Sequence, residues 1–221
     1  MVGAARVSGA REVILGRIRA ALRDVPDAEL TAAPPLPRAY ERRGSLTPAG
    51  VLDLFARRAR GYRATLELAS ESSVGVAVAK VCDQLGVGGL VVPPALPAHW
   101  RPSGIDVIED HGLAGRELDH IDAALTGCAA AIARTGTVLL DGDGSSGRRL
   151  LSLIPDTHIC VIRAEQVVET VPEGLARVAG AVRSSGAPIT LVSGPSASSD
   201  IELTRVEGVH GPRKLVLLLV S

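Results

Sequence analysis

The pattern of apolar positions divides the chain into an N-terminal arm and a longer alternating region. In the arm, residues 11–23 repeat an apolar residue at every fourth position with arginines in between, which predicts an amphipathic helix. Pro26 ends this helix, and the Pro- and Ala-rich residues 26–40 predict an extended linker. We therefore expect residues 1–44 to form a helix and a linker, and residues 45–221 to form the folded domain.

Short apolar runs then alternate with longer helical periods. Strands are expected over residues 64–68, 90–92, 105–108, 137–140, 159–162, 189–192 and 215–220. Helices are expected from Pro48, which follows the N-cap Thr47, and over residues 74–85, 116–125, 126–132, 148–153, 172–182 and 200–206. This alternation predicts the α/β class, with a mostly parallel sheet flanked by helices.

Composition agrees with this fold class and excludes several functions. Hydrophobic residues make up 46% of the 221 residues but aromatic ones only 2%, so the core must consist of Val, Leu, Ile and Ala. Such a core suits parallel strands covered on both faces. The formal net charge is zero, which disfavours nucleic acid and anionic membranes as partners. Without a bilayer-spanning apolar run or the apolar stretch of a signal peptide, the chain is expected to be cytoplasmic.

The three cysteines, Cys82, Cys128 and Cys160, are far apart in the sequence and form no C-x-x-C motif. We expect them to be small buried hydrophobic residues in a reducing compartment. The spacing predicts no metal site and no iron–sulfur cluster in this chain.

Two loops carry candidate ligand residues in the middle of the chain. Thr135, Gly136 and Thr137 place two hydroxyls around a glycine, where backbone can approach a ligand closely. Arg148 and Arg149 follow a glycine- and serine-rich run, and their forked donors suit a carboxylate or a phosphate. An ordinary turn and a solvated loop are the alternatives.

A third loop follows the strand expected at residues 189–192. Its candidate ligand residues are Ser193, Gly194, Ser196, Asp200, Glu202 and His210. A strand, a small-residue loop and a helix start can bind an anion, but Ser199–Glu202 also fits a capping box, so a well-capped turn is the alternative. His210 is the candidate proton carrier, and it could equally brace the loop.

The remaining histidines have simpler explanations. We expect His158 to fix the entry to a strand, and His99, His111 and His120 to be solvated. In open α/β sheets ligands bind beyond the carboxyl ends of the strands. Arg148, Ser196 and His210 are therefore expected to converge in one pocket there.

Three stretches resemble the LUD-domain, lactate-utilization protein C (LutC/YkgG) family. They are Thr126–Thr137 (TGCAAAIARTGT), Gly147–His158 (GRRLLSLIPDTH) and Ser193–Pro212 (SGPSASSDIELTRVEGVHGP). The similarity runs from about Gly61 to the last residues. Cys128 and Arg134 depart from the acidic or polar residues that family members often have.

The resemblance implies a fold similar to the NagB/RpiA/CoA-transferase-like group. It also implies a role in oxidising L-lactate to pyruvate, alongside partner proteins that carry iron–sulfur clusters. Two hypotheses follow. The chain is a non-redox subunit that binds a small anionic ligand, or it is a free-standing enzyme acting on a phosphorylated or acyl-activated small molecule, like an isomerase, CoA-transferase or cyclo-ligase.

The first hypothesis is favoured because CoA-transferase chemistry would usually need a glutamate nucleophile at a strand end. Glu202 is the nearest candidate, and capping already explains it. The tethered N-terminal helix permits contacts with a second subunit, so a homo-oligomer is compatible with either hypothesis.

Overall fold

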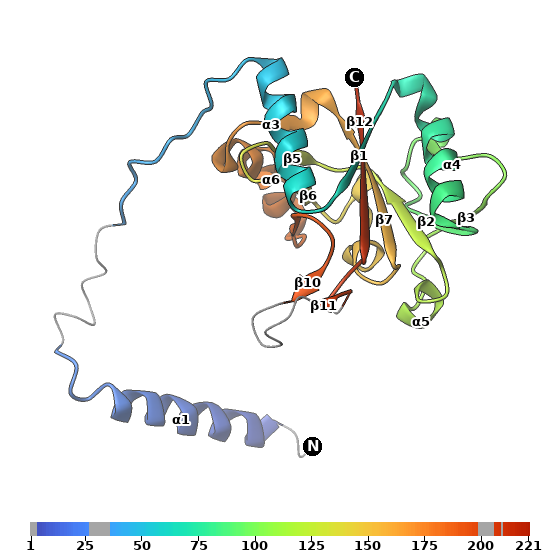
Figure 1. The fold of residues 1–221 in the computed structure, drawn as a ribbon. Coiled ribbons are helices and arrows are strands. Elements are labelled where there is room, and N and C mark those ends of the chain that lie inside the picture. Colours follow the sequence, from blue (N-terminus) through green and yellow to red (C-terminus); the bar gives the residue numbers. More distant parts are fainter. Residues whose placement is uncertain (1–3, 27–35, 199–205, 209) are drawn as a thin grey trace. The chain divides into compact units, whose positions relative to one another are not determined.

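The computed structural model describes residues 4–26, 36–198, 206–208 and 210–221. The chain divides into two units, residues 1–40 and 41–221. The first contains helix α1 (Ala4–Ala21), and the second contains the remaining described helices and strands (Figure 1).

Six parallel strands form the main sheet of the second unit. Their order is β1 (Thr65–Ala69), β12 (Lys214–Val220), β7 (Thr157–Arg163), β4 (Ala123–Thr126), β2 (Gly89–Val92) and β3 (Asp106–Glu109). All adjacent pairs are parallel, so the strands share a carboxyl edge and an amino edge. In Figure 1 the C-terminal residue lies at the carboxyl edge.

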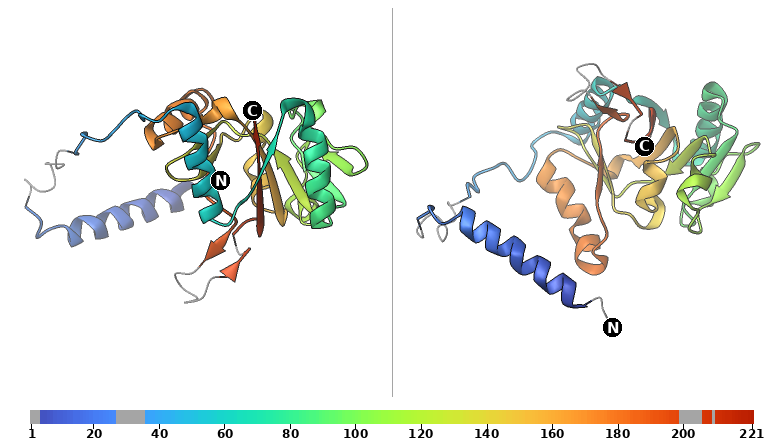
Figure 2. Two further views of the ribbon diagram at one scale, coloured as in Figure 1. Left: turned by 45° about the horizontal axis from the view of Figure 1, so that its top comes forward. Right: turned by 90° about the horizontal axis from the view of Figure 1, so that it is seen from below.

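Helices cover both faces of this sheet (Figure 2). Helix α4 (Val74–Leu85) buries Val78 and Cys82 against one face, and α3 (Pro48–Gly61) buries Phe55 and Ala59 against the other. Thr47 caps α3 by accepting a hydrogen bond from the Gly50 N–H, as its sequence predicts. The short helices are α5 (Gly115–Leu118), η1 (Glu71–Ser73), η2 (Ala98–Trp100), η3 (Gly144–Ser146), η4 (Arg149–Ser152) and η5 (Ala164–Gln166).

A second, mixed sheet lies beside α3 and supports α6 (Val171–Ser185). Its order is β8 (Val167–Val168), β5 (Ala130–Ile132), β6 (Thr137–Leu140) and β9 (Thr190–Val192). Helix α6 packs on it through Val178, which joins Ile132 and Leu139 in one apolar cluster. A two-stranded ribbon, β10 (Ala197–Ser198) and β11 (Val206–Glu207), precedes β12.

The α/β class and the mostly parallel sheet are confirmed. Each expected strand lies within two residues of its predicted bounds. All three cysteines are free and buried, as expected. Among the described residues, no helix is both long and apolar enough to cross a membrane.

The helix expected over residues 116–125 is wrong beyond its first turn, and the helix expected over residues 126–132 is wrong throughout. The structure has the four-residue α5, then strands β4 and β5. Alanine-rich apolar runs suit a helix and a fully buried strand equally, and here burial between two layers selects the strand.

Two further helix predictions need correction or fall outside the structure. Residues 148–153 form only the 3-10 helix η4. The helix expected over residues 200–206 lies outside the described residues, except that Val206 belongs to strand β11.

Candidate functional site

Three hydroxyl groups from two candidate loops meet at one end of the second sheet. Thr137 begins β6, and its Oγ1 donates to Thr135 Oγ1 at 2.7 Å and lies 2.8 Å from Ser193 Oγ. The antiparallel register of β6 and β9 brings Thr137 beside Ser193, because Val138 pairs with Val192. We call Thr135, Thr137 and Ser193 the hydroxyl trio.

Two glycines dock this trio against the end of α3. Gly136 has a φ of +61°, and a Cβ there would lie 2.8 Å from the Arg58 carbonyl carbon. Gly194 has a φ of +83°, and a Cβ there would collide with Tyr62. Both glycines are therefore required by backbone conformation and close packing. Since α3 leads directly into β1, the trio lies near the amino edge of the main sheet.

His158 is buried near the same edge, as the second residue of β7. Its side chain is about 1% exposed, and Nε2 lies 2.8 Å from Thr126 Oγ1. The buried Nδ1 has no hydrogen-bond partner among the described residues. Burial lowers the pKa of His158 to about 4, so the imidazole is neutral at neutral pH.

The third loop folds back onto the residues that lead into β7. The Ser196 N–H donates to the Pro212 carbonyl at 2.8 Å, and the His210 N–H donates to Ser196 Oγ at 3.2 Å. The exposed Arg213 guanidinium lies 3.4 Å from the Asp156 carboxylate. These contacts fix the loop beside the amino ends of β7 and β12.

The first stretch contacts both of the others, and the second contacts Arg213, which directly follows the third. Thr126 meets His158, Thr137 meets Ser193, and Asp156 meets Arg213. Stretches far apart in sequence are therefore joined by separate polar pairs. The hydroxyl trio, His158 and Asp156 lie toward the amino edge, whereas Thr126 ends β4. We call the region of the hydroxyl trio, His158 and Asp156 the amino-edge site.

The expected convergence of Arg148, Ser196 and His210 at the carboxyl ends is wrong. Ser196 and His210 do lie together, but they precede the amino end of β12. Arg148 bonds Asp110, which directly follows β3 at the carboxyl edge, with its Nη2 2.8 Å from Oδ1. Asp110 is nearly fully buried, and a buried carboxylate requires a cationic partner.

Arg149 is exposed at the start of η4, and His210 is exposed as well. Asp200 and Glu202, with the capping box Ser199–Glu202, lie outside the described residues.

The carboxyl edge holds a different polar cluster, which we call the carboxyl-edge clamp. Glu71 Oε1 lies 3.2 Å from Arg163 Nη2, 2.9 Å from the Trp100 Nε1 that donates to it, and 2.8 Å from His99 Nε2. The Arg163 guanidinium stacks 4.8 Å from the Trp100 ring centroid. Hydrogen bonds from Arg163, then from His99, hold the pKa of Glu71 at about 2. The charged groups of the clamp therefore bind one another.

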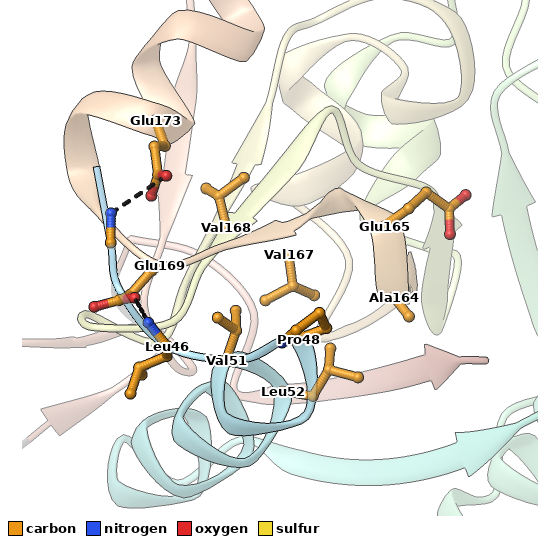
Figure 3. Close-up of a pocket in the computed structure, with 11 residues that line it drawn as sticks. Leu46, Pro48, Val51, Leu52, Ala164, Glu165, Val167, Val168, Glu169 and Glu173 are labelled. Carbon is orange, nitrogen blue, oxygen red and sulfur yellow. Dashed lines mark hydrogen bonds between the residues drawn. The ribbon is translucent and has the colours of Figure 1, made fainter. Parts of the chain in front are cut away.

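A cavity of about 400 Å³ opens between the start of α3 and the segment from η5 to α6 (Figure 3). Its floor is apolar, but Glu165, Glu169 and Glu173 also line it. Glu169 accepts a hydrogen bond from the Leu46 N–H at 2.7 Å, so this carboxylate anchors the entering chain. Three carboxylates disfavour an anionic ligand there.

Arg134 belongs to this anchor and not to a ligand loop. Its Nε and Nη2 donate to Glu169 Oε1, at 3.1 and 2.6 Å, and its Nη1 and Nη2 donate to the Glu41 carboxylate. The arginine that departs from the family pattern thus fixes the segment that leads into α3.

Two residues of the amino-edge site were missed or misread in the sequence. His158 is interpreted only as a strand-entry residue, although a polar side chain directly before the apolar residues 159–162 can signal a buried partner. Arg58 lies in the run Arg57-Arg58-Ala59-Arg60 of α3, which gives no local sign of the turn it contacts.

The fold and these contacts define an α/β domain with a parallel main sheet and a hydroxyl trio near its amino edge. The model of the LUD domain family matches residues 98–220, a range that contains all three stretches. The chain belongs to the LUD domain family.

Individual relatives agree with this assignment. The chain is 48% identical to lactate utilization protein C of Deinococcus radiodurans over 80% of its length and 82% of that protein. It is 29% identical to the uncharacterized protein YkgG of Escherichia coli over 90% of its length and 91% of that protein. A crystal structure of a DUF162 family protein from Deinococcus radiodurans is 43% identical, with a TM-score of 0.71 over 80% of this chain and 100% of that one.

Proposed function

We propose that this protein acts in L-lactate utilization, as a non-redox subunit that binds a small anionic ligand and works with iron–sulfur partner proteins. The observation that carries the proposal is the 48% identity to a lactate utilization protein C over four-fifths of both chains. The three contacting stretches lie within the matched family domain, so the proposal concerns the residues of the amino-edge site.

The chemistry of the amino-edge site supports an anionic ligand. The Thr135 hydroxyl of the trio can donate a hydrogen bond to a carboxylate, and the buried His158 on the same side of the sheet carries no negative charge that would repel one. Cys128 and Cys160 are buried among apolar core residues, which supports a packing role for these thiols. The redox centres are accordingly assigned to partner proteins.

Deletion of the gene in the source organism, in a background without other L-lactate-oxidising enzymes, tests the role. The deletion strain should fail to grow on L-lactate as sole carbon source and grow normally on glucose. Normal growth on L-lactate would overturn the proposal. Affinity purification of the tagged chain should co-purify proteins that contain iron and acid-labile sulfide.

Complementation of the deletion strain tests the amino-edge site. The wild-type gene should restore growth, and Thr137→Val should restore it poorly because it removes the central hydroxyl of the trio. Thr190→Val is the matched control, since this β9 threonine lies outside the trio. Equal restoration of growth by both variants would show that the function does not depend on the hydroxyl trio.

A further inference from the structure

The end of α3 carries Arg57, Arg58 and Arg60, and Arg58 lies directly beside the turn that holds the hydroxyl trio. The contact is close, because a Cβ on Gly136 would lie 2.9 Å from the Arg58 Cβ. Thr135 and Thr137 flank that glycine. The extended side chain of Arg58 is therefore long enough to reach the space in front of both hydroxyls.

These arginines differ from the others that lie near candidate loops. Arg148 is bound by Asp110, and Arg134 by Glu41 and Glu169. Within the described residues, the exposed guanidinium of Arg58 forms no ion pair. A cavity of about 320 Å³ adjoins it, and its described lining consists of Leu54, Arg57 and Arg58.

The hydroxyl trio leaves one proton available for a ligand. Thr137 donates to Thr135, so it must accept from Ser193, since each hydroxyl has a single proton. The hydroxyl proton of half-buried Thr135 is then unused within the trio. A donor hydroxyl beside a guanidinium that has no ion pair among the described residues matches an oxyanion, which offers only acceptors.

We propose that Arg58 supplies the positive charge of the amino-edge site, and that Arg58 and Thr135 together bind a compact oxyanion, either a carboxylate or a phosphate. The sequence suggested Arg148 and Arg149 as the cationic residues that bind the anion. We assign this role instead to Arg58, which lies outside the family-like stretches. This inference rests on the anion binding in the proposed function and names its cationic residue.

Titration calorimetry on the purified full-length chain tests the inference, with L-lactate and inorganic phosphate as separate probes at physiological salt. The wild-type chain should bind one of them with a Kd below about 10 mM. The probe that binds shows whether the oxyanion is a carboxylate or a phosphate. Arg58→Gln should weaken that binding at least about tenfold, and Arg58→Lys should weaken it less.

Arg60→Gln is the matched control, because it removes one positive charge from the same helix two residues away. It should leave binding within about twofold of the wild-type value, as expected for a screened charge. Equal weakening by Arg60→Gln, unchanged binding in Arg58→Gln, or no wild-type binding of either probe would each overturn the inference. Circular dichroism confirms that each variant is folded.

The growth assay and the binding assay separate the two proposals. If the deletion strain fails to grow on L-lactate but the protein binds neither probe, the proposed cellular role is supported and the proposed role of Arg58 is wrong. Binding that depends on Arg58, with normal growth of the deletion strain, would do the reverse.

Discussion

The two edges of the main sheet differ in how their polar and charged side chains are paired. At the carboxyl edge lies the clamp of Glu71, Arg163 and Trp100. Its carboxylate, guanidinium and ring bind one another. At the amino edge, the polar groups are hydroxyls and a neutral histidine, joined by an arginine with no described ion pair. The contrast lies in charge pairing: the charges of the clamp are paired with one another, whereas Arg58 beside the hydroxyl trio has no ion pair within the described residues.

This contrast teaches that a fold-level rule does not by itself locate a site. Open α/β sheets usually bind ligands at the carboxyl ends of their strands, and the sequence was interpreted accordingly. In this chain that edge is occupied by internal ion pairs, Arg148–Asp110 among them, and the hydroxyl trio lies near the opposite edge. Function has to be argued from the site itself.

Removing the ring of the clamp gives the largest expected effect. Trp100 is about 1% exposed, so Trp100→Ala should lower the free energy of unfolding by about 3–5 kcal/mol through lost burial and a cavity. Urea denaturation followed by circular dichroism measures this. A loss below about 1 kcal/mol would mean that the clamp does not hold the carboxyl edge together.

The amino edge should be sensitive to backbone rather than to ring packing. Gly136→Ala should cost about 1–3 kcal/mol, because the new Cβ meets α3 at a positive φ. Gly180→Ala in α6 is the control, since nothing lies within 4 Å of its added Cβ, and it should stabilise the protein by about 0.5–1 kcal/mol. Melting temperatures that move in the same direction for both variants would contradict this explanation.

A smaller effect should appear on acidification. Burial depresses the pKa of His158 from 6.5 to about 4, so the native protein binds fewer protons than the unfolded chain between these pH values. Stability should therefore fall as the pH falls, with His158 contributing a loss of about 1.5 kcal/mol between pH 6.5 and 5.

His158→Gln should lack this pH-dependent component. Denaturant titrations at several pH values measure the difference between the two proteins. Parallel pH profiles for the variant and the wild-type chain would show that His158 is not a buried neutral group.

The sequence predicts much of the fold because its signals are local. Strand β12 is an apolar run, and α3 carries both a capping threonine and a following proline. The prediction fails for residues 116–132, where small apolar residues fit either structure and the decision comes from distant layers. Burial between sheets cannot be derived from such a run alone.

The site is less predictable because its contacts are long-range. Thr135, Thr137 and Ser193 were singled out and do meet, yet their meeting depends on the register of β6 and β9. Arg148 was assigned to a ligand although Asp110, 38 residues earlier, binds it. Arg58 gains its role only because α3 ends against Gly136, a contact between residues far apart in the sequence.

The position of β12 between β1 and β7 also determines when this domain can assemble during translation. When the ribosome has released the chain only as far as β7, β1 has no neighbour in the sheet, because its partner residues begin at Val216. The nascent domain therefore exposes two unpaired strand edges, on β1 and β7, until β12 emerges. Chaperone protection of the nascent chain is accordingly most valuable during this late interval of synthesis.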